Sequence, residues 1–158
     1  MANPTESLLS TFTPLLEAAE GLDLTDPAAA RDALEARFPF EGEAARALRA
    51  ELSEHLEAGR LCERGELPMR WGRVSKALPE SRDFSIDVVQ MNGAGPRHRH
   101  PNGEVNFCIG TEGAPTFDGL PPGWVVFPPG STHVPTVAGG MMLIVYLLPG
   151  GAMELLDR

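Results

Sequence analysis

Apolar residues in the first third of the chain recur every three or four positions, a spacing typical of helices that bury one face. They form three groups separated by turn residues: Leu8, Phe12, Leu15, Leu16 and Ala19; Ala30, Leu34 and Phe38; and Ala45, Leu48, Leu52 and Leu56. The pattern predicts about three amphipathic helices within residues 1–65, the last of them over residues 43–58. Such helices must cover another surface, either the remainder of this chain or a partner subunit.

Capping residues indicate where these helices begin and end. Asp26 followed by Pro27 is a typical helix start, because the carboxylate caps free N–H groups and proline fits the first turn. Gly59 is a typical helix end, since glycine readily adopts the left-handed conformation that terminates helices. Pro14 interrupts the first helical pattern, so it either kinks that helix or begins a second piece behind Thr13.

Near residue 65 the pattern changes to short apolar runs separated by Gly, Pro, Asn and Asp. Residues 66–158 hold 13 of the 17 glycines and 11 of the 15 prolines, which indicates strands and turns. The predicted strands cover residues 69–76, 84–91, 104–109, 115–118, 123–127 and 141–148. Short, evenly spaced strands favour a sandwich or a barrel of the jelly-roll type. We expect a mainly β protein, with a barrel over residues 66–158 that follows the helical segment over residues 1–65.

Charge and composition restrict the partners of the chain. Its 22 acidic and 13 basic residues give a formal net charge of −9, which argues against a nucleic-acid partner. No apolar run is long enough to span a bilayer and the N-terminus lacks signal-peptide features, so we expect no membrane partner and a cytoplasmic location. Cys62 and Cys108 are expected to be reduced, and Cys108 either points toward the barrel interior or packs as a core thiol. We also expect a homodimer, because the helices and a barrel edge offer apolar surface.

Three of the four histidines and one glutamate lie in two short segments at the ends of predicted strands. His98 and His100 are two residues apart and would face the same side of a strand. Glu104 follows a Pro-Asn-Gly turn, and His133 follows a Pro-Pro-Gly turn, where a strand would end at the mouth of a barrel. Imidazole and carboxylate ligands suit Fe, Zn, Mn, Ni or Co better than Ca or Mg. We therefore predict one divalent transition metal ion; histidines that cluster on the surface by chance are the alternative.

Two further polar residues are candidates for the same site. An inward Arg73 would either hold a substrate carboxylate or form a structural ion pair with Asp87 or Glu104, because an unpaired guanidinium is costly inside a barrel. Asn106 shares the strand face of Glu104, where it would orient water or the substrate, or else form a structural hydrogen bond.

For several other residues a structural role competes with a functional one. Trp71 and Trp124 either wall an aromatic pocket or belong to the core. His55 lies at the edge of a helical apolar stripe, where a packing role is favoured over a role as ligand or proton carrier. Arg97 and Arg99 alternate with the two histidines, so we expect them to face away from the metal, solvated or paired with the acidic helices.

The spacing of the metal candidates resembles the two sequence motifs of the cupin family, although each motif is one residue shorter than the usual pattern. The matching residues are His98, His100, Glu104 and Gly110, and then Gly123, Pro128, Gly130 and His133. Around them, over roughly residues 60–150, the chain resembles the cupin-type 4-hydroxylaminobenzoate lyase family. The segments that carry this resemblance are residues 84–89, 100–104, 117–119, 123–124, 129–131 and 146–149.

The resemblance implies a cupin (jelly-roll) barrel and a function. The function would be a metal-dependent lyase of nitroaromatic degradation that converts a small aromatic acid, 4-hydroxylaminobenzoate, to 3,4-dihydroxybenzoate (protocatechuate) and ammonia without a redox cofactor. Glu104 would then be a metal ligand or the group that transfers protons, and Arg73 would hold the substrate carboxylate. Two alternatives stay open: an Fe(II)-dependent dioxygenase of a small aromatic substrate, and a non-catalytic cupin that binds a metabolite.

Overall fold

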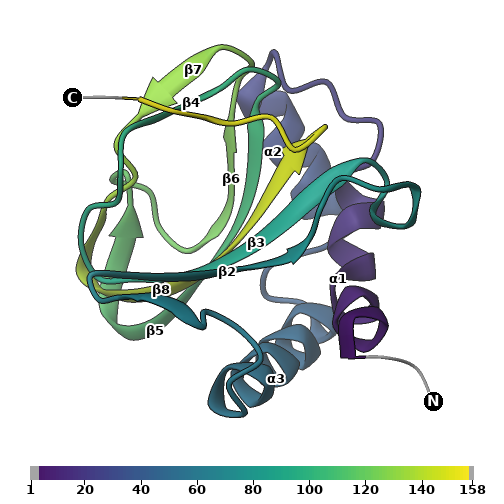
Figure 1. The fold of residues 1–158 in the computed structure, drawn as a ribbon. Helices are drawn as coiled ribbons and strands as arrows, with labels where there is room; N and C mark the ends of the chain where they lie inside the picture. Colours follow the sequence, from purple (N-terminus) through teal and green to yellow (C-terminus); the bar gives the residue numbers. More distant parts are fainter. Residues whose placement is uncertain (1–3, 157–158) are drawn as a thin grey trace.

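The computed structural model describes residues 4–156, and its helices precede its strands as the sequence pattern predicts (Figure 1). The helices are α1 (Pro4–Ala19), α2 (Pro27–Arg37), α3 (Glu43–Glu57) and a short 3-10 helix (Pro79–Ser81). The strands are β1 (Arg64–Glu66), β2 (Met69–Ser75), β3 (Phe84–Met91), β4 (His98–His100), β5 (Glu104–Phe117), β6 (Gly123–Phe127), β7 (Ser131–His133), β8 (Val137–Pro149) and β9 (Glu154–Leu155).

The three predicted helices are confirmed, with ends close to those that the capping residues indicate. The Asp26 carboxylate accepts a hydrogen bond from the N–H of Ala29 at 3.1 Å, and Gly59, just beyond α3, has a φ of +77°. Pro14 lies inside α1, which continues through it as one helix, so no second piece begins there. Among the described residues, no helix combines the length and the apolar character needed to cross a membrane.

Two strand predictions, residues 84–91 and 123–127, have the observed bounds. The separate strands predicted over residues 104–109 and 115–118 are instead one long strand, β5, whose pairing with β8 shifts register twice along its length. Strands β1 and β9 were not predicted, because two or three residues are too few to show an alternating pattern.

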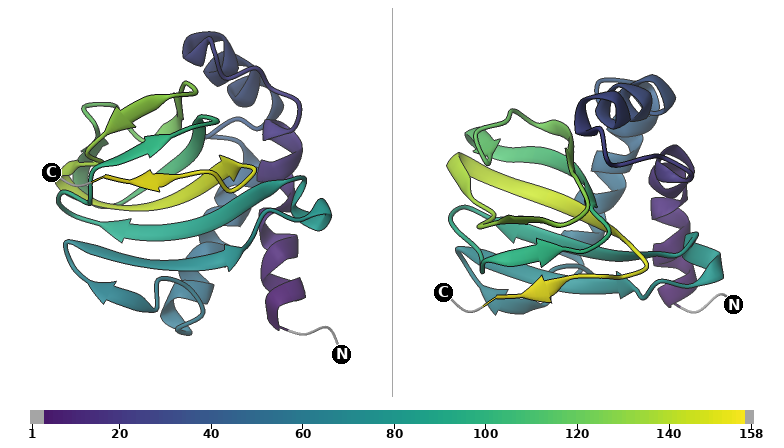
Figure 2. Two further views of the ribbon diagram at one scale, coloured as in Figure 1. Left: turned by 45° about the horizontal axis from the view of Figure 1, so that its top comes forward. Right: turned by 90° about the horizontal axis from the view of Figure 1, so that it is seen from above.

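The strands form two antiparallel sheets rather than a closed barrel. The large sheet has the order β1-β2-β3-β8-β5-β6, and the small sheet has the order β7-β4-β9. The mainly β, cupin-like fold is therefore confirmed, although the two sheets are not joined into one continuous ladder. The views in Figures 1 and 2 show the short strands β4 and β7 lying across from the large sheet, with the helices on another side of it.

One face of the large sheet packs against the helices. This face carries Ile86, Val88, Val105, Phe107, Trp124, Val145 and Leu147, which share a core with the apolar faces of the helices. The indole N–H of Trp124 donates a 2.9 Å hydrogen bond to the carbonyl of Phe38, just beyond α2. The helices thus cover the sheet of their own chain and need no partner subunit to bury their apolar stripes. The homodimer stays a prediction.

Candidate metal centre

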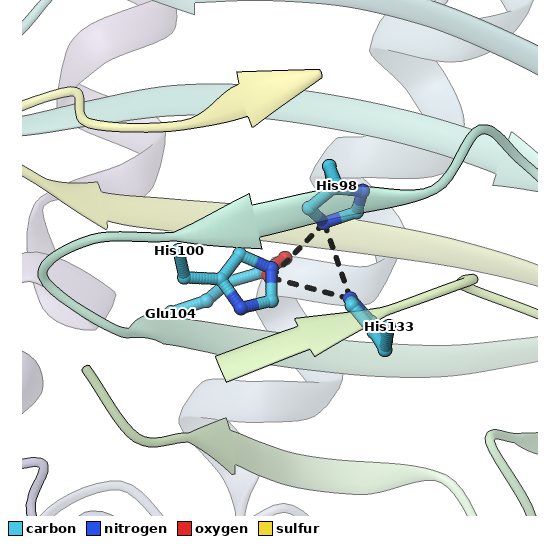
Figure 3. Close-up of side chains that lie close together, drawn as sticks. All are labelled: His98, His100, Glu104 and His133. Carbon is cyan, nitrogen blue, oxygen red and sulfur yellow. Dashed lines mark hydrogen bonds and ion pairs between the residues drawn. The ribbon is translucent and has the colours of Figure 1, made fainter. Parts of the chain in front are cut away.

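The four predicted metal ligands meet between the two sheets (Figure 3). His98 and His100 point from the same face of β4, and His98 lies directly opposite His133 of β7 in the strand register. Glu104 begins β5 after a tight turn at Gly103, whose φ is +87° and where a Cβ would lie 2.9 Å from the carbonyl oxygen of Phe127. The turn therefore requires glycine, and it returns the chain so that the glutamate faces the imidazoles.

The ligand atoms of these residues all lie within 4.8 Å of one another. The Nε2 atoms of His98 and His133 are 3.1 Å apart. Oε2 of Glu104 lies 3.5 Å from Nε2 of His98, 3.7 Å from Nε2 of His133, and in direct contact with Nε2 of His100. Two ligand atoms about 2.1 Å from one ion, at right angles to each other, lie about 3.0 Å apart. The imidazole separation is therefore of the size expected for a shared ion.

Each imidazole is held through its other nitrogen. Nδ1 of His98 donates to the carbonyl of Pro96 at 3.1 Å, and Nδ1 of His100 lies 3.0 Å from Oγ of Ser131. Nδ1 of His133 donates to Oδ2 of Asp118 at 2.5 Å. A carbonyl and a carboxylate can only accept, so the Nε2 atoms of His98 and His133 are left to face the centre of the cluster. Metal-bound histidines show this arrangement, in which the second nitrogen is anchored by the protein.

The cluster contains buried polar atoms whose hydrogen-bonding capacity the protein does not meet. Within residues 4–156, Nε2 of His100 and both carboxylate oxygens of Glu104 are buried without a properly oriented hydrogen-bond partner. Leaving such atoms unpaired is costly, and a cation at the centre would satisfy them together. The donor set of three imidazoles and one carboxylate suits Fe, Zn, Mn, Ni or Co. The residues present therefore fit a transition metal ion.

The surroundings of Glu104 and His133 determine whether these two residues of the cluster are charged. Burial raises the pKa of Glu104, but close contacts of its carboxylate with the imidazoles of His100, His133 and His98 outweigh burial and hold that pKa well below its ordinary value. For His133, burial lowers the pKa, whereas Asp118 and Glu104 raise it more strongly, to about 9. The glutamate is thus ionised, and His133 carries a proton near neutral pH that a bound cation would replace.

A cavity of about 620 Å³ opens beside the cluster and is bordered by His98 and Glu104. Its walls are largely apolar and include Met69, Trp71, Val89, Pro96, Pro135, Tyr146, Leu148, Met153 and Leu155. Its other charged residues are Arg64, Arg73 and Asp87. An apolar cavity with a few polar groups and a metal-type cluster is typical of a small-molecule site.

The structure brings Arg73 to this cavity and also pairs it. Nε and Nη2 of Arg73 donate to the two carboxylate oxygens of Asp87 at 3.1 and 3.3 Å, so the predicted pair with Asp87 is confirmed and the one with Glu104 is not formed. The guanidinium of Arg64 lies 5.3 Å above the ring of Trp71 and has no carboxylate partner among the described residues. This end of the cavity therefore carries a net positive charge.

The remaining predictions divide between the cavity and the core. Trp71 borders the cavity, whereas Trp124 is buried in the core with the helices. Asn106 is fully buried, and its two amide atoms have no hydrogen-bond partner within residues 4–156, so the predicted structural hydrogen bond is not formed. Cys108 packs in the inner core, and burial raises the pKa of its thiol well above the ordinary value. It is a protonated core thiol.

His55, Arg97 and Arg99 lie outside the cluster, and two of them have structural contacts. His55 lies 3.3 Å from Oγ1 of Thr11 and accepts a 2.8 Å hydrogen bond from Nε of Arg60, away from the cluster. Arg97 is exposed, as expected. Arg99 pairs with Glu154 of β9 at 3.2 Å, so the expectation of a helical partner is wrong for this residue: β9 pairs with β4 and places its glutamate nearer.

Sequence reasoning missed several residues of the site. Asp118 ends the predicted strand over residues 115–118, and nothing local links it to His133, fifteen positions away, or to the N–H of Thr136, from which it also accepts a hydrogen bond. Ser131 and Tyr146 lie in segments that carry the family resemblance, and Arg64 precedes the first predicted strand, but the sequence assigns none of the three a chemical role. Only the pairing of distant strands reveals their roles.

The two sheets and the cluster of three histidines and one glutamate define a cupin-like protein with a site that fits a metal ion. The family model described as PnbB: 4-hydroxylaminobenzoate lyase matches residues 15–155, and the chain belongs to this family. It is 33% identical over 93 residues to a 4-hydroxylaminobenzoate lyase of Nocardioides sp. (strain LMS-CY), covering 54% of this chain and 55% of the relative. It is 29% identical over 104 residues to a 4-hydroxylaminobenzoate lyase of Pseudomonas putida, and this match covers 63% of this chain and 58% of the relative. The matches thus span less than two thirds of the length of these relatives.

Solved structures with a similar arrangement are more distant. A cupin-like protein from Thermotoga maritima matches 62% of this chain and 86% of its own with 14% identity and a TM-score of 0.44. The DMSP lyase DddQ from Ruegeria pomeroyi matches 92% of this chain and 76% of its own with 22% identity and a TM-score of 0.40. Similarity at this level says nothing about activity.

Proposed function

We propose that this protein is a metal-dependent lyase that converts 4-hydroxylaminobenzoate and water to 3,4-dihydroxybenzoate and ammonia. Membership of the 4-hydroxylaminobenzoate lyase family supports the reaction. The observation that carries the proposal is the cluster of His98, His100, His133 and Glu104 at the wall of a largely apolar cavity with arginines at its border. Homodimeric assembly, a cytoplasmic location and a role in nitroaromatic degradation are further predictions within this proposal.

The chemistry balances without an external oxidant. The N–O bond breaks and its oxygen leaves as water after taking a proton. One water adds to the ring carbon beside the nitrogen-bearing carbon, and a second hydrolyses the resulting imine to release ammonia. Loss of the ring proton restores the aromatic ring, so the net reaction consumes one water. The N–O bond supplies the oxidising equivalent, and neither nicotinamide nor flavin takes part.

Each group of the site has a role in this scheme. The three histidines and Glu104 hold the ion, which when bound supplies Lewis-acid assistance to the departure of the hydroxylamino oxygen. Oε1 of Glu104 has no hydrogen-bond partner within residues 4–156, which supports a role for this atom in accepting and returning protons. Asn106 orients water or substrate with its unpartnered amide. Arg73 holds the substrate carboxylate through the guanidinium nitrogen that Asp87 does not occupy.

The decisive experiment is turnover of 4-hydroxylaminobenzoate by purified, metal-analysed protein under anaerobic conditions without added nicotinamide or flavin. We expect 3,4-dihydroxybenzoate and ammonia in equal amounts, loss of activity on chelation, and recovery when the native metal returns. His98→Ala should be inactive, and His55→Ala, which changes the one histidine outside the cluster, should retain activity.

Other outcomes would contradict the proposal in distinct ways. A strict requirement for oxygen would favour the dioxygenase alternative. Saturable binding of the substrate without any conversion would favour a metabolite-binding protein. An unchanged rate in demonstrably metal-free protein would show that the ion has no part in the reaction.

A further inference from the structure

A row of four polar residues crosses one face of the large sheet, and three of them, Arg73, Asp87 and Tyr146, border the cavity. Arg73 of β2 lies opposite Asp87 of β3, Asp87 lies opposite Tyr146 of β8, and Tyr146 lies opposite Asn106 of β5. Neighbouring strands are about 4.8 Å apart, so the row places one polar side chain on each of four adjacent strands at this spacing. Arg73 and Asp87 form an ion pair, whereas the Tyr146 hydroxyl contacts only a sulfur outside the row and the Asn106 amide has no partner within residues 4–156.

The hydroxyl of Tyr146 has only a weak partner. The residue is 7% exposed and borders the cavity, and its hydroxyl contacts Sδ of Met91 at 3.7 Å. A thioether is a poor acceptor, and a buried hydroxyl normally finds an oxygen or nitrogen. This hydroxyl therefore has hydrogen-bonding capacity to offer a molecule in the cavity.

Tyr146 lies at the metal end of the cavity. Its ring centre is 6.3 Å from that of Phe117, which is itself 6.1 Å from the ring centre of His133, so a single side chain separates the phenol from a ligand of the cluster. Asn106, its neighbour in the row, is two residues from Glu104 on the same face of β5. The strand β8, which carries Tyr146, is next to β5, which carries Glu104, whereas β2, which carries Arg73, lies three strands away from β5.

The phenol is a donor under ordinary conditions. Burial raises the pKa of Tyr146 well above its ordinary value, and the charges of Glu104, Cys108, Asp118 and Asp87 raise it further. The hydroxyl therefore keeps its proton, and a substrate atom with a lone pair is the matching partner.

We propose that Tyr146 is a substrate-binding residue whose hydroxyl donates a hydrogen bond to the hydroxylamino group of the substrate. The inference rests on the proposed function for the identity of that group. In this binding mode the substrate carboxylate lies at Arg73, and the hydroxylamino group lies between Tyr146 and the cluster. The row would therefore select an aromatic acid whose reacting group is on the opposite side of the ring from its carboxylate.

Kinetics of two matched variants test this role. Tyr146→Phe removes only the hydroxyl, and we expect kcat/KM for 4-hydroxylaminobenzoate to fall about 10-fold, as for a lost neutral hydrogen bond. Met91→Leu removes the sulfur partner with little change in volume and should leave kcat/KM near the wild-type value. Wild-type kcat/KM in Tyr146→Phe, or an equal loss in both variants, would overturn the proposal, because the hydroxyl would then serve only the fold.

A binding measurement keeps the inference separate from turnover. Tyr146 is the only tyrosine of the chain, so incorporation of 3-fluorotyrosine gives one fluorine NMR signal at this position. We expect a saturable shift with the unreactive acid 4-hydroxybenzoate, and a clearly smaller shift with benzoate, which lacks the acceptor. Equal shifts, or none, would overturn the inference. If the shift is seen but 4-hydroxylaminobenzoate is not converted, the proposed function fails and the binding role stands.

Discussion

Asp118 and His133 are joined by a 2.5 Å hydrogen bond from Nδ1 to Oδ2, which fixes the imidazole so that Nε2 faces Glu104. Asp118→Asn keeps the size of the side chain and its bond to the Thr136 N–H but loses this acceptor. We expect metal affinity to fall about 10- to 100-fold, as for other outer partners of metal ligands. Competition with a chelator measures this affinity.

The matched control for that change is Asp83→Asn. Asp83 has a similar left-handed backbone, with φ of +63° against +49° for Asp118, but it is exposed and remote from the cluster. The metal affinity of Asp83→Asn should equal that of the wild type. If the two variants bind the ion equally well, Asp118 does not support His133 in the way described.

Replacing a central histidine should remove the ion before it removes the fold. His100 is fully buried in direct contact with Glu104, and the surrounding core is apolar. We expect His100→Ala to contain less than about a tenth of the wild-type metal, in line with the loss of a ligand, while its far-ultraviolet circular dichroism stays unchanged. Metal analysis of His55→Ala gives the reference for a histidine outside the cluster, and full metal content in His100→Ala would show that His100 is no ligand.

Arg73 should govern affinity for carboxylated substrates. In Arg73→Gln the Asp87 carboxylate, whose side chain is 17% exposed, loses its partner and would repel a negative substrate. We expect KM for 4-hydroxylaminobenzoate to rise about 10-fold or more, in the range of one charged hydrogen bond. The neutral analogue phenylhydroxylamine should show little change. Arg99→Gln, which breaks only the outer pair with Glu154, is the control; a rise of equal size there would make the effect nonspecific.

The helices and the large sheet should unfold together. Leu34 of α2 is fully buried in the core that both layers share. Leu34→Ala should lower the free energy of unfolding by about 2–5 kcal/mol and keep a single transition, followed by the fluorescence of buried Trp124 and by circular dichroism. Leu155→Ala, at a position that is 66% exposed, should change stability by no more than about 0.5 kcal/mol. Two separate transitions would show that residues 1–65 fold independently.

The predicted homodimer is testable by sedimentation equilibrium, where it should have twice the 17.0 kDa mass of the chain. Exposed apolar side chains such as Trp71, Leu67 and Val134 are candidates for burial in such an interface. A stable monomer at micromolar concentration would contradict it. A variant that lacks residues 1–40 would not test this prediction. Removing α1 and α2 exposes the core of the chain itself, which favours aggregation in a monomer and in a dimer alike.

The sequence alone determined the elements with a sustained pattern and the identity of the predicted metal ligands. The helices over residues 4–57 follow from apolar positions at helical spacing and from the Asp26 cap, both of which are local properties. His98 and His100 were placed together because alternation in a strand is also local. The turns before Glu104 and His133 then indicated that these side chains return to the same place.

Only the tertiary structure decided which distant residues complete the site. The bond from His133 to Asp118, the pairing of Arg73 with Asp87, and the row that ends at Tyr146 and Asn106 all depend on strand register. Register between strands far apart in sequence is set by the packing of whole faces, so no local pattern encodes it. For the same reason the sequence predicted a barrel, whereas the observed strand order leaves two separate sheets with the cavity between them.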